Sequence, residues 1–189
     1  MKLDDRIIRK NLKDFLSVRK PSPKMILEEL GVHNGNAIAD VVAIYKVAHC
    51  YEIKSDKDRI ERVLKQIEFF DLSFSKLTLV TTKKFLNRAI ELLPPYWGIL
   101  VAIQKNQSKI IFQYKRKAKY NPNWNSEKSL LSLWKSELLD LGSKTNCSNL
   151  KNWHSRAVLA KTISSGCGKA WIREEFNKTV YQRYLSQSR

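Results

Sequence analysis

Three charged residues lie inside two apolar stretches of the segment 37–59. Asp40 interrupts the first β-branched run, and Glu52 and Lys54 interrupt the second. Residues two apart on a strand point to the same face, so Glu52 and Lys54 are expected to lie side by side. Burying these charges unpaired would cost several kcal/mol, so they require each other, a metal ion or water. The three residues therefore mark a candidate site.

The spacing of the two acids indicates which chemistry such a site would do. Eleven residues separate Asp40 from Glu52, which lets two adjacent antiparallel strands bring the carboxylates together. Mg²⁺ prefers oxygen ligands and binds through one or two carboxylates plus a phosphate. It can polarise a scissile phosphate and lower the pKa of a bound water, while Lys54 orients that water or stabilises the developing charge. This combination predicts metal-dependent phosphodiester hydrolysis.

Two structural interpretations of the same residues stay open. Asp40 also fits an acid that satisfies a strand end or a turn, and Glu52 with Lys54 fits a plain ion pair. An acid-x-Lys triplet is a weak motif by itself. Its position inside an apolar strand, rather than on a helix surface, favours a catalytic site over these structural interpretations.

The surrounding pattern predicts the elements that position these residues. Apolar residues at helical spacing predict a helix within 4–18. Pro23 and Gly31 are typical start and stop signals of a short helix over 23–31. After the two strands of the opening segment, a helix is expected to begin at Ser55 or Asp56, which can cap it. Further along we expect a strand at 76–82, a helix at 83–93, two strands around a turn at 105–108, one helix over 126–142 and two more helices after it. This order indicates an α/β fold with a mixed sheet and helices packed on it.

Charge is the strongest global signal. The 189 residues include 35 Lys and Arg against 18 Asp and Glu, a net charge of +17, and residues 105–189 alone carry +12. A polyanionic partner is the natural reading, because phosphate neutralisation and counterion release supply most non-specific nucleic-acid affinity. A merely soluble basic protein, or an anionic membrane surface, is the alternative. The residues that we expect to touch the nucleic-acid backbone lie beside the proposed site and in the Tyr114–Tyr120 region, and are Lys57, Arg59, Arg62, Lys115, Arg116, Lys117 and Lys119.

Several protein classes are excluded by what the sequence lacks. It has no apolar run near the roughly 20 residues that span a bilayer, and its beginning lacks the apolar core of a signal peptide. We therefore expect a cytoplasmic protein. The three scattered cysteines suggest neither a disulfide framework nor a zinc site.

Asp40 followed by Glu52-Ile53-Lys54 resembles the PD-(D/E)XK nuclease superfamily, whose members share the restriction-endonuclease-like fold. The segments "YEIKSDKDRIERVLKQ", "FDLSFSKLTLVTT", "LPPYWGILVA", "NPNWN" and "LLSLWKSELL" extend the resemblance to a family of small bacterial and phage proteins within it. The resemblance implies a nuclease-like core at 1–120, with a mixed sheet flanked by helices. It leaves a basic helical C-terminal extension at 121–189, expected to pack on the core.

The resemblance also implies roles for particular residues. Asp40 and Glu52 would bind Mg²⁺, for which Mn²⁺ could substitute, and Lys54 would position the attacking water in hydrolysis of DNA. An acid from a preceding helix often completes such sites, and Glu29 is preferred to Glu28 for it. Gln66 matches the glutamine of a QxxxY element. Two positions depart from the family pattern, with Phe70 in place of the tyrosine and Ile38 where an arginine is usual.

Two other functions share these features. One is a catalytically silent module that keeps the nuclease fold for nucleic-acid binding or assembly. The other is a cleaving subunit that acts only within a larger transposition or defence complex. The sequence leaves open a homodimer or a larger complex, DNA against RNA, and endonuclease against exonuclease mode.

Overall fold

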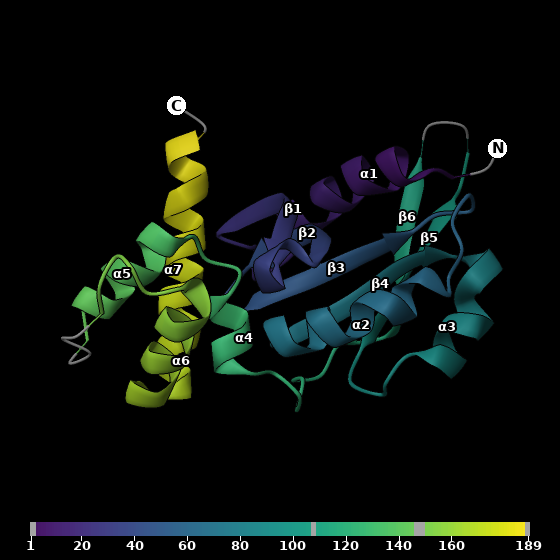
Figure 1. Ribbon diagram of the computed structural model, residues 1–189. Coiled ribbons are helices and arrows are strands. Elements are labelled where there is room, and N and C mark those ends of the chain that lie inside the picture. Colours follow the sequence, from purple (N-terminus) through teal and green to yellow (C-terminus); the bar gives the residue numbers. More distant parts are fainter. Residues whose placement is uncertain (1–2, 107–108, 146–149, 188–189) are drawn as a thin grey trace.

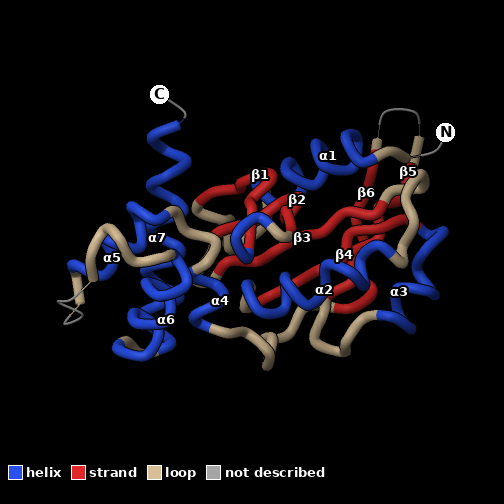
Figure 2. Tube along the Cα trace, viewed as in Figure 1, coloured by secondary structure: helices blue, strands red, loops and turns tan. Residues whose placement is uncertain are grey.

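A computed structural model describes residues 3–106, 109–145 and 150–187. Its centre is a six-stranded mixed sheet with strands in sequence order (Figures 1 and 2). The two inner pairs β3–β4 and β4–β5 are parallel and the other three are antiparallel. The strands are β1 (Met25–Val32), β2 (Ala37–Ile44), β3 (Ala48–Lys54), β4 (Lys76–Thr82), β5 (Gly98–Gln104) and β6 (Ile110–Arg116). The predicted α/β class with a mixed sheet is confirmed.

Helices cover both faces of this sheet. On one face, α1 (Asp5–Ser17) buries Ile8, Leu12 and Leu16 in a core shared with β2, β3, β4 and β5. On the other face lie α2 (Arg62–Ser73) and α3 (Leu86–Leu92), which connect the parallel strands. Alternate residues of β3 therefore belong to different cores: Tyr51 and Ile53 to the α1 side, and Cys50 to the α2 side.

The C-terminal helices continue the core on the α2 side. They are α4 (Ser126–Leu130), α5 (Lys135–Ser143), α6 (Arg156–Gly166) and α7 (Lys169–Gln187). Leu138, Leu159 and Ile172 are fully buried in the same cluster as residues of β1, β2 and α2. Figure 1 shows α5, α6 and α7 gathered beside the β1 end of the sheet. In the part of the chain that is described, no helix is long and apolar enough to cross a membrane.

Three element predictions are wrong. Residues 25–32 form strand β1 rather than a helix, because every residue of the segment except Glu29 pairs with β2 and this pairing overrides its helical start and stop signals. The helix expected from Ser55 begins only at Arg62, because the Ser55 main-chain N–H donates to Asp58 Oδ2 (2.8 Å) in a preceding turn. The helix expected over 126–142 is two helices, with Trp134 as the N-cap of the second.

A buried ion pair joins the last helix to α5. Arg183 of α7 donates from Nε to Glu137 Oε1 (2.7 Å) and from Nη2 to Glu137 Oε2 and the Ser132 carbonyl (3.1 Å). Both side chains are largely buried. Removing one partner of such a pair leaves an uncompensated charge in the core.

We expect Arg183→Ala to lower the free energy of unfolding by about 3 kcal/mol, because Glu137 would lose its partner while staying buried. Chemical denaturation followed by circular dichroism measures this. Lys144→Ala, which removes an exposed pair with Asp140, is the matched control and should change stability little. Equal effects of the two substitutions would contradict this role of Arg183.

Candidate active site

The candidate site lies where β2 and β3 separate. The two strands pair from Ile44–Ala48 to Val41–Tyr51, and the pairing stops there although both strands continue. Continued pairing would place Ile53 opposite Ala39. Instead, the main-chain N–H of Ile53 donates to Asp40 Oδ2 at 2.8 Å. The Asp40 carboxylate therefore takes the place of a main-chain acceptor in the gap between the strands.

An irregularity in the neighbouring pair explains how Asp40 reaches that gap. Glu29 of β1 lies opposite Asp40 in the register but is not paired with it, and its φ is +56°. Such a φ is uncommon for a residue other than glycine. Ala39 belongs to the core on the α2 side and Val41 to the core on the α1 side, so β2 changes face at Asp40. The break in alternation directs Asp40 into the gap and not into either core.

Glu52 and Lys54 face each other on β3, as their spacing predicts. Lys54 Nζ donates to Glu52 Oε1, and the two residues are 7% and 1% exposed. Glu52 Oε2 is buried and has no hydrogen-bond partner among the described residues. Burial, and then the charge of Asp40, raises the pKa of Glu52 to about 8. Asp40, Glu52 and Lys54 thus form one electrostatically coupled group.

Helix α1 contributes two residues that the sequence reasoning missed. Arg9 donates to Asp40 Oδ1 (2.9 Å), to Glu29 Oε1 (3.2 Å) and, through Nε, to Asp5 Oδ1 (3.1 Å). Burial raises the pKa of Asp5, against the opposing effect of Arg9, and the charge of Asp40 raises it further. The available signal was the Asp5–Arg9 spacing of four residues on one helix face. Nothing in the sequence indicated that this helix lies over the β2–β3 gap.

Glu29 does not have the position expected of it. It lies on a strand rather than on a helix, and its side chain is 72% exposed, with Arg9 between its carboxylate and that of Asp40. Glu28 is paired with Lys13 of α1. The helix that precedes the two site strands and does carry an acid at the site is α1, through Asp5.

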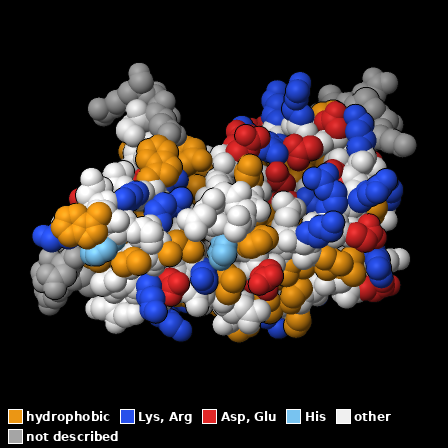
Figure 3. Space-filling model, viewed as in Figure 1, with side chains coloured by type: hydrophobic (Ala, Val, Ile, Leu, Met, Phe, Trp, Pro, Cys, Tyr) orange, Lys and Arg blue, Asp and Glu red, His pale blue; other side chains and the backbone are white. Residues whose placement is uncertain are grey.

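The loop after β3 carries the basic residues predicted beside the site. Lys57 and Arg59 are exposed in this loop, and Arg62 is exposed at the start of α2. The loop is held by Asp56, which accepts from the Leu3 N–H (3.0 Å) and from Thr82 Oγ1 (2.6 Å). Figure 3 shows acidic side chains gathered beneath α1, with several lysines and arginines on their right-hand side. Acidic and basic side chains therefore lie side by side on this part of the surface.

The remaining predicted site residues lie apart from this group. Gln66 is half-buried on α2, and no hydrogen bond links it to the three strand residues in the described chain. Lys115, Lys117 and Lys119 are exposed at the end of β6 and after it. Arg116 is not a free surface cation, because its guanidinium donates to the carbonyls of Trp97 (2.7 Å), Pro94 (3.0 Å) and Leu93 (3.3 Å).

The donor set at the gap fits a hard divalent cation with few protein ligands. Glu52 Oε2 is a buried carboxylate oxygen with no partner among the described residues, and the Asp40 carboxylate is its close neighbour. Within residues 3–106, 109–145 and 150–187, no three His, Cys, Asp or Glu side chains form a complete metal cage. Two carboxylates suit Mg²⁺, which retains waters and accepts phosphate oxygens as further ligands.

Comparison with known proteins finds a matching family and a curated relative. The family described as "Bacteriophage P4 protein cII" matches residues 2–189. Protein cII of Enterobacteria phage P4 is 28% identical over 167 residues, which are 88% of this chain. The chain spans 62% of the length of that relative. A solved structure, the SPO1766 protein of unknown function from Silicibacter pomeroyi, is 16% identical with a TM-score of 0.41, over 69% of this chain and 85% of that one.

Proposed function

The chain belongs to the family described as bacteriophage P4 protein cII, and for this chain we propose a Mg²⁺-dependent nuclease of restriction-endonuclease-like fold that hydrolyses phosphodiester bonds in DNA. The observation that carries the proposal is the convergence of Asp40, Glu52 and Lys54 where β2 and β3 separate. A buried carboxylate oxygen without a partner in the described chain supports it, since such a group costs free energy unless a ligand uses it.

Each residue of the group has a role in this proposal. Asp40 and Glu52 would hold Mg²⁺, which when bound polarises the phosphate and acidifies a water. Lys54 donates to Glu52 Oε1 through Nζ, and in this proposal it would orient the attacking water or stabilise charge on the phosphate. Asp5 takes the part first assigned to Glu29, as the acid supplied by a preceding helix.

Arg9 controls the charge of the site before any metal binds. Its guanidinium contacts Asp5, Glu29 and Asp40 at the same time and offsets part of their mutual repulsion. Asp40 would hold Mg²⁺ with the same carboxylate that Arg9 contacts. The Arg9 guanidinium could also bind a substrate phosphate in a bidentate manner.

The contact between Arg9 and Asp40 favours a second candidate function. If Arg9 stays bound to Asp40 in the presence of Mg²⁺, the chain is a nucleic-acid-binding or assembly module without turnover, or it cleaves only when a partner moves α1. Calorimetric titration with Mg²⁺ separates the cases: a saturable binding signal in the isolated chain supports the nuclease, and its absence supports the module.

We expect the purified chain to cut DNA in Mg²⁺ and in Mn²⁺ but not in EDTA. The substrates are a circular single strand, a linear duplex and an RNA of matched length, each followed by gel electrophoresis. Cutting of the circle assigns endonuclease mode, because a circle has no ends. Faster cutting of the RNA than of either DNA would contradict the assignment of DNA as the substrate.

A further inference from the structure

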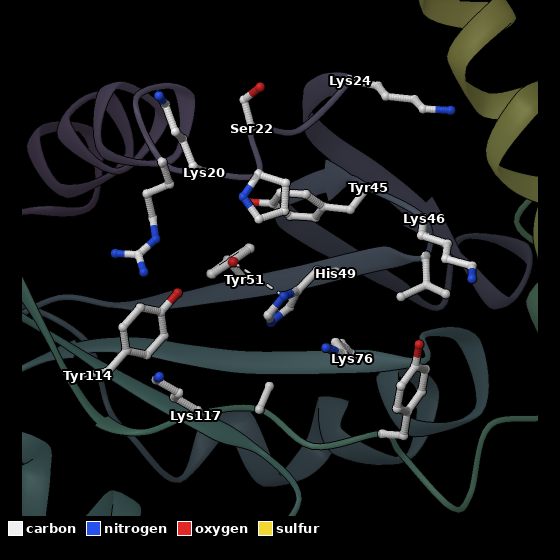
Figure 4. Close-up of a pocket in the computed structure, with 15 residues that line it drawn as sticks. Lys20, Ser22, Lys24, Tyr45, Lys46, His49, Tyr51, Lys76, Tyr114 and Lys117 are labelled. Atoms are coloured by element: carbon white, nitrogen blue, oxygen red, sulfur yellow. Dashed lines mark hydrogen bonds between the residues drawn. The ribbon is translucent and has the colours of Figure 1, made fainter.

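A cavity lies away from the proposed catalytic group. It has a volume of about 650 Å³ and is lined by the segment after α1, the β2–β3 turn, residues of β3 and β4, and the segment from Tyr114 to Tyr120 (Figure 4). His49 and Tyr51 of β3 form its floor on the α1 side of the sheet, whereas Glu52 and Lys54 alternate with them and face the α2 side. His49 and Glu52 are about 10 Å apart along the strand. The cavity is therefore a separate feature of the molecule.

The rim of this cavity is strongly cationic. Six basic side chains line it and no Asp or Glu does. None of the six has an ion-pair partner within 4.0 Å in the described part of the chain. Glu174 of α7 lies beyond ion-pair distance of these six cations. Of the six, only Lys24 lowers the pKa of Glu174. The six are Arg19, Lys20, Lys24, Lys46, Lys76 and Lys117.

The floor and walls are aromatic and uncharged. The His49 and Tyr51 rings are stacked, with centroids 4.2 Å apart. Burial lowers the pKa of His49 to about 3, so its ring is neutral near pH 7 and bonds Thr78 Oγ1 through Nε2 (2.8 Å). Tyr45 and Tyr114 line the cavity near Tyr51, as Figure 4 shows. The cavity thus combines flat rings and hydroxyl groups with unneutralised positive charge.

Tyr120 offers a stacking face at the edge of the cavity. Its side chain lines the cavity and the residue is 58% exposed. Lys76 Nζ lies 5.0 Å from the centroid of its ring, so a cation and an aromatic surface are presented together. Stacking on aromatic rings and contact with basic groups are the two means by which proteins bind single-stranded nucleic acid without reading its sequence.

We propose that this cavity binds a nucleotide unit, with its phosphate among the rim cations and its base against the tyrosine rings. Its volume lies within the roughly 300–1,000 Å³ typical of small-ligand sites. A simple anion would not need the aromatic walls, and an acidic peptide offers no flat ring to stack on them. The unit is either a free nucleotide or one residue of a single strand. The inference goes beyond the proposed hydrolysis and uses none of Asp40, Glu52 and Lys54.

Binding in EDTA tests this site separately from any cleavage. The probes are a fluorescent eight-nucleotide thymidine oligonucleotide, with unlabelled thymidine monophosphate and polyglutamate as competitors, and the readout is fluorescence anisotropy. The test variant is the pair Lys76→Gln and Lys117→Gln. The matched control is the pair Lys161→Gln and Lys169→Gln, which removes the same charge from exposed positions on α6 and α7.

We expect the cavity variant to bind the oligonucleotide about tenfold more weakly than wild type, and its log–log salt slope to be shallower by about 1.4, for two lost phosphate contacts. The control should bind within twofold of wild type. Tyr120→Leu should also lose about tenfold in affinity, with the salt slope unchanged, because it removes stacking and no charge. Competition by the monophosphate assigns a free nucleotide, and competition by oligonucleotides alone assigns a strand.

Three outcomes would overturn the proposal. The first is equal weakening by the cavity and control variants, which would mean general electrostatic attraction. The second is Tyr120→Leu binding as wild type does. The third is displacement of the oligonucleotide by polyglutamate at equal charge concentration in wild type but not in the cavity variant, which would assign the cavity to acidic protein segments. None of these results bears on metal-dependent cleavage.

Discussion

Lys54→Met is expected to lower the rate of Mg²⁺-dependent DNA cleavage by about 10³-fold, the scale of a lost charge-stabilising or proton-transferring group. Methionine has a similar length and no charge, so it fills the buried position without contributing Nζ. Lys54 is 7% exposed and its Nζ donates to Glu52 Oε1. Single-turnover cleavage of a labelled strand measures the rate.

Two comparisons separate chemistry from folding in this experiment. Thermal unfolding of Lys54→Met should remain cooperative, because Glu52, with its pKa raised to about 8, is mostly protonated at neutral pH and can lose its partner at modest cost. Lys161→Met, on an exposed position of α6, should cleave at the wild-type rate. A folded Lys54→Met protein with wild-type cleavage would remove Lys54 from the mechanism.

Glu52→Gln is expected to stabilise the metal-free protein increasingly from pH 5 to pH 8, by a few kcal/mol at the upper end. The folded protein holds a proton on Glu52 up to about pH 8, whereas the unfolded chain releases it near pH 4.5. Between these values the folded state binds more protons, so wild-type stability falls as the pH rises, and above about pH 8 the loss is complete. The amide has no proton to release and avoids this loss.

Mg²⁺ should narrow the stability difference between the two proteins at pH 8. Binding at tenfold over the dissociation constant stabilises the native state by about 1.4 kcal/mol, and only the wild type presents the Glu52 carboxylate. Urea unfolding at pH 5, 6.5, 8 and 9, with and without 10 mM Mg²⁺, checks both statements. A difference between variant and wild type that is independent of pH would contradict the buried, proton-binding state of Glu52.

Local sequence patterns predicted most of the sheet and the proximity of the three charged strand residues. Asp40, Glu52 and Lys54 were found because charge inside an apolar strand is costly and visible in one dimension. Strand β1 was missed because Pro23 and Gly31 are typical of a helix, while the pairing with β2 that fixes it is a non-local contact. Arg9 and Asp5 were missed for a related reason. Their helix was predicted, but its packing over the β2–β3 gap depends on tertiary contacts of Ile8, Leu12 and Leu16.

The basic residues show the same division between local and non-local information. An excess of positive charge beyond residue 105 was plain from the sequence, yet Arg116 is bonded to three main-chain carbonyls and Lys117 lines a cavity with Arg19 and Lys76. Residues from four separate segments form that cavity. Charge patterning can predict a polyanionic partner, but only the fold shows which cations share a site.

Comparison of wild type with Asp40→Asn in one cleavage assay tests the central claim most directly. The asparagine amide oxygen can still accept the Ile53 N–H that Asp40 accepts at 2.8 Å, so the fold is kept while the negative charge is lost. With the circular single strand and the linear duplex, each in 10 mM Mg²⁺, we expect wild type to cut at least one of the two and EDTA to abolish the cutting, and Asp40→Asn to produce no products above the EDTA background. Equal cleavage by the two proteins, or persistence of wild-type cleavage in EDTA, would contradict a metal-dependent site at Asp40, Glu52 and Lys54.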